Sequence, residues 1–587
     1  MTARQLEYFP NLVTMFLSRA ADKGNQPFLW AKRDEAWRPI SWREAARQVA
    51  ALAESLMRMG LEPGDRVMLV SENRPEWLIA DLGIMAAGCV TVPTYTTNTT
   101  RDHTHILGNS GAKAVFVSNQ KLARTLVPAV LYSSECHHII GIENIRTGQV
   151  SDDANYHHWD DLIAGEPDIP ALEHRLKTVK REDLACIIYT SGTGGAPRGV
   201  QQHHGAILAN IAGAADIIST DFGWGDEVFL SFLPASHAYE HSGGQYFPVG
   251  LGAQIYYAES LEKLAANIEE VGPTIMVVVP RLFEMLRARI LKTVEKGGIS
   301  EYLLKRALSI GSSRYKGRVK PWDLPMDGLL SLTMRRKVRA KFGGRIKAMV
   351  SGGAPLNPEV GLFFHSLGLT LLQGYGQTEA GPVISCNRPR AGIRMDTVGP
   401  PVRGAEVRIA EDGEIMVRGE LVMHGYWRNP EETARVLKDP GDGTGAWLAT
   451  GDVGHLDDKG RSVITDRKKD LIVNDKGDNV SPQRVEGMLT LQPEIVQAMV
   501  YGDRRSHLVA LLVPDPDYAG EVDLQQRLGL AVDRVNAELS IVERVRRFII
   551  ADAPFTIENE QLTPSMKIRR HVLKAVYGER LDALYKK

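Results

Sequence analysis

A glycine- and hydroxyl-rich segment at residues 189–200, YTSGTGGAPRGV, combines the residue types that bind phosphate groups. Glycines let backbone amides approach phosphate oxygens closely, serine and threonine hydroxyls donate hydrogen bonds, and Arg198 supplies a positive charge. The segment is not a Walker loop, because Val200 instead of lysine follows the last glycine, and Pro197 stands where a GxGxxG loop needs its third glycine. The residue types favour a polyphosphate site, although a loop of this composition can also be a plain surface connection.

The flanking residues place this loop at the end of a strand. The apolar run at residues 183–190, DLACIIYT, predicts a buried strand, and residues 201–218, QQHHGAILANIAGAADII, predict a helix. The loop between them therefore lies at the carboxyl end of a strand, where α/β sheets usually bind their ligands.

Strands and helices alternate through the part of the chain that precedes the loop. Ser41 and Glu44 have the spacing of a capping box at the start of a helix, the apolar run at residues 66–70 predicts a strand, and Asn73 is the expected cap of the next helix. A further apolar run at residues 112–118 predicts another strand. This alternation predicts a large α/β body built on a parallel sheet.

The pattern changes after about residue 395. The stretches AEVRIAEDGEIMVRGE and GHLDDKGRSVITD alternate apolar and polar residues around turns, which indicates a small antiparallel, β-barrel-like subdomain at about residues 395–466. Beyond it, strands are expected at residues 497–502 and 508–514 and a helix at residues 539–550. These elements predict a compact α+β unit at the end of the chain.

Composition bounds the kind of partner and the cellular setting. The 587 residues include 70 Lys and Arg against 71 Asp and Glu, so no overall field attracts nucleic acid. The four cysteines lack metal or disulfide spacing, which fits a reducing cytoplasm, and the paired histidines at 137–138 and 157–158 have no ligand partners and are expected at the surface. No window approaches the roughly 18 apolar residues of a spanning helix, and the first residues predict a docked amphipathic helix.

The opening segment resembles the phosphate loop YTSGTTGxPKGV of the adenylate-forming superfamily, which includes acyl-CoA synthetases, luciferases and peptide-synthetase adenylation domains. Further motifs resemble that superfamily in its order: LSFLPASHAYE, VSGGAPL, LLQGYGQTEAG, WLATGDVGHLDDKG, DRKKDLIVNDKG and LTPSMKIRR. The resemblance spans about residues 40–570. Within the superfamily, VVVPRLFEML and the insertion after it look most like long-chain fatty acyl-CoA synthetases.

This resemblance implies an α/β fold in which a large N-terminal domain of parallel αβ layers (residues 1–468) carries the β-rich subdomain and is followed by a small mobile α+β C-terminal domain (residues 469–587). It implies ATP, Mg²⁺ and coenzyme A as cofactors and Lys469 as the hinge. The implied catalytic residues are Lys567, Thr378, Glu379, which also holds the metal, and His237 beside the substrate carboxylate. The implied nucleotide-binding residues are Thr190, Ser191, Gly192, Thr193, Gly194, Gly195, Arg198, Gly353, Ala354, Pro355, Gln373, Gly374, Tyr375, Gly376, Asp452 and Arg467.

The chain departs from the superfamily pattern at three places. Gly194 replaces a threonine and Arg198 a lysine in the phosphate loop, and Lys476 precedes Gly477 where relatives often have a second glycine. Arginine keeps the charge but presents a planar fork in place of a compact ammonium group. We expect these departures to affect rate and pantetheine access more than the type of reaction.

The expected function is ATP-dependent activation of a carboxylic acid, a medium- to long-chain fatty acid, to acyl-AMP with release of pyrophosphate, followed by transfer to coenzyme A. One alternative is adenylation of a fatty or aromatic acid with transfer to a carrier protein. Another is a catalytically weak nucleotide-binding homologue that serves in regulation. Neither chain length of the acid nor oligomeric state can be read from the sequence.

Basic residues gather in the insertion that follows residue 286. They are Arg314, Lys316, Arg318, Lys320, Arg335, Arg336, Lys337, Arg339 and Lys341. Such a cluster is usually a solvated face, and it can also attract coenzyme A phosphates or an anionic bilayer, which leaves peripheral membrane contact open.

Overall fold

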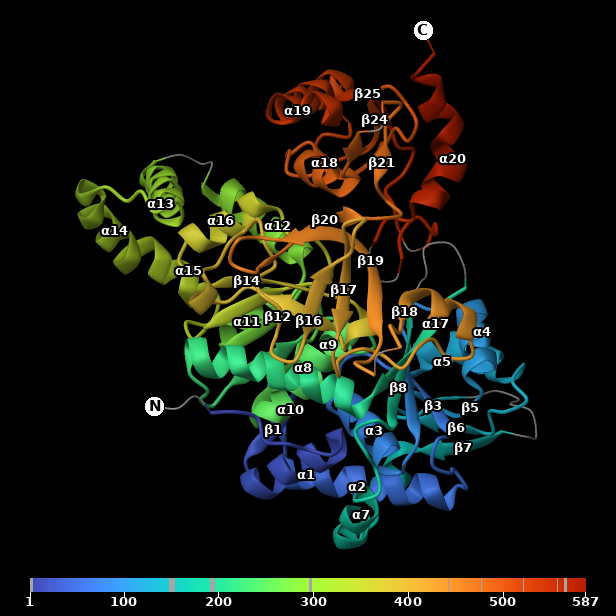
Figure 1. Cartoon of the computed structure of the whole chain (residues 1–587). Helices are drawn as coiled ribbons and strands as arrows, with labels where there is room; N and C mark the ends of the chain where they lie inside the picture. Colours follow the sequence, from blue (N-terminus) through green and yellow to red (C-terminus); the bar gives the residue numbers. More distant parts are fainter. Residues whose placement is uncertain are drawn as a thin grey trace.

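The computed structural model describes residues 4–146, 154–190, 196–294, 298–441, 443–476, 478–520, 522–556, 558–563 and 567–586. Figure 1 shows a large body with the end of the chain folded as a separate lobe above it. Two large sheets, one small antiparallel sheet and the C-terminal sheet organise these residues.

The first large sheet has seven strands in the order β7-β6-β5-β3-β4-β8-β9, all parallel to their neighbours except β9. Its strands are β3 (Arg66–Val70), β4 (Val90–Pro93), β5 (Ala112–Val117), β6 (His138–Gly141), β7 (Asn155–His158), β8 (Leu184–Thr190) and β9 (Arg198–His203). The predicted strands at 66–70, 112–118 and 183–190 are confirmed. The helix expected from residue 201 begins only at His204, because residues 198–203 turn back along β8 and fill the edge of the sheet.

The second large sheet has eight strands in the order β15-β14-β13-β12-β10-β11-β1-β2, with antiparallel strands only at its two edges. Its strands are β1 (Pro27–Arg33), β2 (Ala36–Ser41), β10 (Val228–Ser231), β11 (Gln254–Tyr257), β12 (Ile275–Val278), β13 (Ala348–Ser351), β14 (Leu371–Gly376) and β15 (Val383–Cys386). The parallel sheet that the alternating pattern predicts is thus present twice.

A shared hydrophobic core joins the two large sheets. It combines apolar residues of α1, α2, α3 and α8 with strand residues of both sheets, such as Phe116 and Phe229. Every residue of α3 is buried, which explains why its sequence is apolar on all sides apart from Glu76 and Asp81. The helices of this body are α1 (Leu12–Lys23), α2 (Trp42–Arg58), α3 (Pro75–Ala86), α4 (Thr100–Ser110), α5 (Gln120–Val130), α6 (Trp159–Ile163), α7 (Ile169–Leu176), α8 (His204–Ile217), η1 (Ile218–Phe222), α9 (Ala238–Glu240), η2 (His241–Tyr246), α10 (Phe247–Leu251) and α11 (Leu264–Val271).

Two of the predicted helix caps differ in detail. Ser41 caps α2 by accepting a hydrogen bond from the Glu44 amide at 3.2 Å, but the Glu44 carboxylate pairs with Arg47 and does not complete a capping box. The prediction that Asn73 caps α3 is wrong, because Arg74 precedes the helix and makes no side-chain cap. The Asn73 side chain instead bonds a loop of the second sheet, as described below.

A long helical insertion covers one edge of the second sheet. It packs the apolar residues Phe283, Leu304 and Leu330 against strands β10 to β14. Its elements, and the helices that follow, are α12 (Pro280–Val294), α13 (Ile299–Tyr315), η3 (Pro321–Asp323), α14 (Leu324–Leu330), η4 (Ser331–Arg335), α15 (Arg336–Lys341), α16 (Pro358–Ser366), η5 (Thr378–Ala380) and η6 (Pro389–Ala391). Figure 1 shows α13, α14 and α15 at the outer edge of the molecule, on its left side.

The antiparallel subdomain forms as its alternating sequence predicts. Strands β16, β17, β19 and β18 lie in that order, and β20 pairs with β19. Its elements are β16 (Glu406–Ile409), β17 (Glu414–Arg418), α17 (Pro430–Val436), β18 (Leu437–Lys438), β19 (Trp447–Leu456) and β20 (Ser462–Arg467).

The C-terminal region is a small α+β unit, as predicted, but one of its elements differs. Residues 539–550 were expected to be helical, whereas Val545–Ile550 form β25, which pairs in parallel with β24. The apolar, β-branched residues at the end of this segment suit a sheet position, and the need to complete the sheet overrides the local helical pattern. The elements are β21 (Ile472–Val473), β22 (Asn479–Val480), α18 (Pro482–Leu489), β23 (Ile495–Tyr501), β24 (Leu508–Pro514), α19 (Leu524–Glu538), η7 (Ile541–Glu543), β25 (Val545–Ile550) and α20 (Arg570–Ala583).

Three further expectations can be compared with the structure. The N-terminal segment docks through α1, whose apolar residues are buried. His138 and His157 are half-buried and lie 3.1 Å apart through their ring nitrogens, so they are less exposed than expected. Among the described residues, no helix combines the length and apolar composition needed to cross a bilayer.

Candidate active site

The carboxyl ends of parallel strands bring the predicted motifs to one edge of the fold. β8 ends at Thr190, β13 ends just before Gly353, β14 ends at Gly376, and β10 leads into the loop that carries His237. β10, β13 and β14 belong to one sheet, so the motifs that follow them share one rim. β8 belongs to the other large sheet, and Tyr426 joins its hairpin to this rim by contacting both Arg198 and Glu379.

Asp452, Tyr375 and Arg467 form one contact group across two sheets. The Tyr375 hydroxyl donates a hydrogen bond to Asp452 Oδ2 at 2.6 Å, and Arg467 Nε lies 3.4 Å from Asp452 Oδ1. Asp452 and Arg467 are also paired in register between β19 and β20. Burial raises the pKa of Asp452, while Arg467 and Tyr375 act in the opposite direction and favour the carboxylate. The group can present a fixed pair of acceptor oxygens to a diol.

Glycines shape the surface beside this group. Gly353 has a φ of +80°, which a side-chain-bearing residue rarely adopts, and residues 353–355 are exposed along the rim. A Cβ at Gly376 would lie 1.9 Å from the carbonyl oxygen of Pro382, so only glycine fits there. The side chain of Gln373, another predicted nucleotide-binding residue, is buried and donates to the Met395 carbonyl at 2.6 Å.

Thr378 and Glu379 lie on the short helix η5, which neighbouring segments hold from both sides. The Gln202 side chain donates a hydrogen bond to the Thr378 carbonyl. The Tyr426 hydroxyl donates to Glu379 Oε1 at 2.8 Å, and the Met423 amide donates to the Glu379 carbonyl at 2.9 Å. These contacts leave the Thr378 hydroxyl and the second carboxylate oxygen of Glu379 for a ligand.

The predicted phosphate loop closes a hairpin between β8 and β9. Thr190 and Arg198 face each other at its base. Residues 191–195, which include Ser191, Gly192, Thr193, Gly194 and Gly195, lie outside the described residues. Arg198 forms an ion pair with Glu432 of α17, and its guanidinium group stands 4.6 Å from the centre of the Tyr426 ring.

Lys567 brings the C-terminal unit to the same rim. Its amide donates to Thr563 Oγ1 at 3.0 Å, and its carbonyl accepts from the Thr563 amide at 2.8 Å, so the backbone at Lys567 is tied to Thr563. Although the residue reaches the surface, desolvation and the positive charge of Arg467 lower the pKa of Lys567 to about 8, while Asp452 and Glu379 act in the opposite direction. Lys567 therefore shares an electrostatic environment with the residues of the large body.

His237 is oriented by its own backbone. It caps α9, and its Nδ1 accepts a hydrogen bond from the Tyr239 amide at 3.2 Å, which leaves the proton of a neutral ring on Nε2. Burial, with a contribution from Lys567, lowers the pKa of His237 to about 4. The ring is therefore neutral near pH 7 and can donate through Nε2.

Asn73 holds the loop before His237 in place. Its amide nitrogen donates to Ser231 Oγ at 2.8 Å and to the Leu233 carbonyl at 2.5 Å, and its side-chain oxygen accepts from the Ala235 amide at 2.9 Å. Neither this role nor those of Tyr426, Gln202 and Glu432 was predicted. No local signal marks them, because each acts on a segment that is distant in sequence.

The predicted hinge, Lys469, is an exposed residue that directly follows an anchored one. Lys468 Nζ contacts Asp412 Oδ2 at 2.5 Å and Glu414 Oε2 at 3.0 Å, which ties it to the antiparallel subdomain. Lys469 follows in an exposed turn that leads into β21. Gly477, in the loop beyond, lies outside the described residues.

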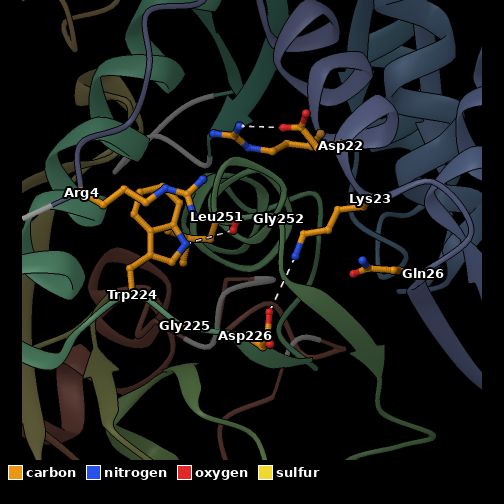
Figure 2. Close-up of a pocket in the computed structure, with 10 residues that line it drawn as sticks. Arg4, Asp22, Lys23, Gln26, Trp224, Gly225, Asp226, Leu251 and Gly252 are labelled. Carbon is orange, nitrogen blue, oxygen red and sulfur yellow. Dashed lines mark hydrogen bonds and ion pairs between the residues drawn. The ribbon is translucent and has the colours of Figure 1, made fainter.

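A cavity of about 400 Å³ lies away from this rim and is shown in Figure 2. It borders Trp224 and Asp226, which precede the amino end of β10, whereas the predicted site occupies carboxyl ends of strands. Its charges are largely matched within the protein, since Lys23 contacts Asp226 at 3.7 Å and Arg4 stands 4.1 Å from the Trp224 ring centre. We therefore assign the cavity to the packing of the N-terminal segment.

Comparisons with known sequences agree with the order of the motifs. Residues 16–427 match the family described as AMP-binding enzyme, and residues 469–587 match its C-terminal domain. The long-chain-fatty-acid–CoA ligase FadD15 of Mycobacterium tuberculosis is 32% identical, with 98% of this chain and 97% of the relative covered. Long chain acyl-CoA synthetase 1 of Arabidopsis thaliana is 28% identical, with 100% and 92% covered. The chloroplastic long-chain-fatty-acid–[acyl-carrier-protein] ligase AEE15 of the same plant is also 28% identical, with 93% and 82% covered.

Solved structures share the fold at lower identity. The adenylation domain of a carboxylate reductase from Mycobacterium chelonae has a TM-score of 0.75 and 23% identity, covering 99% of this chain and 92% of that one. The anthranilate CoA ligase AuaEII, in complex with anthranoyl-AMP, has a TM-score of 0.71 and 20% identity, with 98% of each chain covered. These likenesses establish the two-part α/β architecture.

Proposed function

This chain belongs to the family of AMP-binding enzymes, and we propose that it activates a medium- to long-chain fatty acid with ATP and transfers the acyl group to coenzyme A. The observation that carries the proposal is the contact group of Tyr375, Asp452 and Arg467, together with the electrostatic influence that Lys567 exchanges with Asp452, Glu379 and His237. A cation, two carboxylates and a neutral imidazole from separate segments form a set suited to a carboxylate and a nucleotide.

Magnesium fits the donor set of this rim. Glu379 and Thr378 offer the hard oxygen ligands that Mg²⁺ prefers, and Mg²⁺ is commonly bound by one or two carboxylates together with substrate phosphates. When bound, Mg²⁺ would neutralise charge on those phosphates.

In the first half-reaction, a carboxylate oxygen of the fatty acid attacks the α-phosphorus of ATP. The bond from that phosphorus to the oxygen bridging the β-phosphate breaks, and pyrophosphate leaves with the bonding electrons. His237 would donate through Nε2 to the carboxylate and position it, while Thr378, Arg198 and Lys567 stabilise the charge on the transferring oxygens. Asp452 and Arg467 would hold the ribose, and Tyr375 would line the purine side.

In the second half-reaction, the thiolate of coenzyme A attacks the acyl carbon, and the bond from that carbon to the AMP oxygen breaks. We propose that residues 469–587 rotate about Lys469, so that Lys567 leaves and the loop after the hinge arrives. The ion pairs of Lys468 support a boundary at this point, because they fix the chain up to the residue before the turn.

The relatives support a fatty acid and coenzyme A as partners through their own described activities. Transfer to a carrier protein is the second candidate, since one relative is described as an acyl-carrier-protein ligase. We place the enzyme in the cytoplasm, which agrees with four buried cysteines that form no disulfide. The regulatory alternative is less well supported, because the chain keeps Glu379, Asp452 and Lys567, which a protein without catalysis would not need.

The test is pyrophosphate release from ATP and Mg²⁺ with acids graded from acetate to oleate and one aromatic acid, each with and without coenzyme A. We expect release that increases with chain length and requires coenzyme A for turnover. Release that is indifferent to coenzyme A would favour a carrier-protein acceptor. Nucleotide binding without any release would favour the regulatory alternative.

A further inference from the structure

We propose that the outer face of the helical insertion docks on an anionic lipid bilayer. This insertion face consists of Lys316, Arg318, Lys320, Trp322, Leu324, Leu329, Leu332, Arg336, Lys337 and Arg339. A basic surface by itself does not identify its partner. The structure adds that large apolar side chains on the same insertion are exposed.

Large apolar side chains gather on this face instead of being scattered. Trp322 is 72% exposed, Leu324 56%, Leu329 48% and Leu332 74%. Single exposed apolar residues are ordinary on protein surfaces, but four within eleven residues form a patch that normally has a partner. Tryptophan is also the side chain best suited to the boundary between water and lipid.

Two leucines of the patch and two of the basic residues follow one stripe of a nearly continuous helical run from η3 to α15. Pro325, Leu329, Leu332, Arg336 and Arg339 are all exposed and are spaced by alternating steps of four and three residues. The opposite side of the same run carries Met326, Leu330, Met334 and Val338, which pack on the core of the insertion. The run is thus amphipathic in an unusual way, because its solvent side is itself apolar in the first half and basic in the second.

This run is held firmly from beneath. Arg335 is buried and its Nη1 lies 2.7 Å from Asp327 Oδ1, and Arg314 of α13 also pairs with Asp327. The exposed side chains are therefore presented by a fixed scaffold. Substitutions on the outer stripe leave these contacts intact.

The excess positive charge of the insertion indicates that its partner is anionic. Residues 299–341 contain eleven Lys and Arg against three Asp and Glu, in a chain whose net charge is −1. Among the described residues, Lys316, Arg318, Arg336, Lys337 and Arg339 have no ion-pair partner, and Lys320 stands 5.5 Å from the Trp322 ring centre. A planar surface that is anionic outside and apolar beneath matches both halves of the stripe. Figure 1 shows the insertion at the edge of the molecule, where a flat surface can reach it.

The test measures binding of the full chain, without substrates, to phosphatidylcholine vesicles with and without phosphatidylglycerol. We expect binding only to the anionic vesicles, weakening with salt, with a blue shift of tryptophan emission that Trp322→Phe removes. Each basic residue near a membrane surface contributes about fivefold in affinity, so Arg336→Glu/Lys337→Glu/Arg339→Glu should reduce binding at least tenfold. Leu329→Ser/Leu332→Ser should also reduce binding to the anionic vesicles, because it removes two of the apolar side chains that insert into the bilayer.

Helix α5 and the residues after it offer a matched control, since Lys121, Arg124 and Tyr132 are also exposed. Lys121→Glu/Arg124→Glu and Tyr132→Ser should bind vesicles as the wild type does. Equal binding by the wild type and the insertion-face variants would overturn the proposal. So would a wild type that ignores anionic vesicles and instead forms a dimer that Leu329→Ser/Leu332→Ser abolishes. Vesicle binding is read without turnover, so its outcome is separate from that of the proposed ligase activity.

Discussion

The Tyr426 hydroxyl donates a hydrogen bond to Glu379 Oε1 at 2.8 Å, across the boundary between the antiparallel subdomain and the rim of the large sheets. The same tyrosine ring lies beneath the Arg198 guanidinium group. One side chain therefore positions both the proposed metal ligand and the cation at the base of the phosphate hairpin. Burial and the Glu379 carboxylate raise the pKa of Tyr426, so its hydroxyl stays protonated and acts as a donor.

Tyr426→Phe should weaken the use of Mg²⁺ while the fold is retained. The substitution keeps the ring under Arg198 but removes a hydrogen bond to a charged group, a loss of about 1.5–3 kcal/mol or roughly 10- to 150-fold in kcat/KM. Pyrophosphate release measured against Mg²⁺ concentration should show a higher half-saturating concentration. Tyr132→Phe, at an exposed position, serves as the control. An unchanged Mg²⁺ dependence would contradict the positioning role of Tyr426.

Lys567→Ala should separate the two half-reactions. Adenylation should fall about 10²- to 10³-fold, because a charge aimed at the transferring oxygens is lost, while thioester formation from supplied acyl-adenylate should change little. Lys574→Ala, on the exposed side of α20, is the matched control. Equal loss in both half-reactions would argue against the mobile role of this lysine.

The pH dependence of adenylation should follow the same lysine. The pKa of Lys567 is lowered to about 8, so the free enzyme loses this cation as the pH rises through 8, and kcat/KM for ATP should fall above that value. Bound polyphosphate adds negative charge and should move the corresponding limb of kcat to higher pH. Lys567→Arg keeps its charge over this range, so an alkaline limb that persists in this variant would assign the titration to another group.

Substitutions of Arg198 can show whether ATP binding requires only a positive charge at the base of the phosphate hairpin. Arg198→Lys should keep KM for ATP within about fivefold of the wild type, because an ammonium group retains the charge but loses the planar contact with Tyr426. Arg198→Ala should raise KM at least tenfold. Initial rates over a range of ATP concentrations distinguish the two variants. Equal increases in both would show that the planar fork, not the charge, is what the site requires.

The sequence predicted individual elements better than the contacts between them. The strand at β8 and the helix at α2 follow from local apolar patterns and were confirmed. By contrast, the bond from Tyr375 to Asp452 joins residues 77 positions apart, and no local pattern encodes it. Residues 539–550 illustrate the same limit within an element, because the free edge of β24, which is formed elsewhere in the chain, decides that Val545–Ile550 become a strand.

At the candidate site, residues within recognisable motifs could be predicted, whereas residues that position them could not. Lys567 and Glu379 could be singled out because each stands in a motif that resembles one of the adenylate-forming superfamily. Asn73 could not be singled out, because its sequence context suggested a helix cap. In the structure its side chain follows a strand of the first large sheet and bonds the loop of the second sheet that carries His237. Supporting residues gain their roles from the fold, so they become visible only when the segments are assembled.

Glu240 should make the stability of the folded chain depend on pH. Its carboxyl group is buried beside Ser231 Oγ at 2.6 Å, and burial raises its pKa to about 8, although the hydrogen bonds from Ser231 and Gln245 act in the opposite direction. Between the ordinary pKa of glutamic acid, about 4.3, and pH 8, the folded state binds a proton that the unfolded state has lost. The free energy of unfolding should therefore decrease as the pH rises through this window and level off above it.

Glu240→Gln removes the ionisable group and keeps an oxygen that accepts from Ser231. Its free energy of unfolding, measured by urea denaturation from pH 5 to 9, should depend less on pH than that of the wild type and should exceed it above pH 8. Glu173→Gln, at an exposed position, should run parallel to the wild type throughout. If Glu240→Gln instead lowers stability by the same amount at every pH, the carboxyl group is ionised in the folded chain, and the buried network around Ser231 must stabilise that charge.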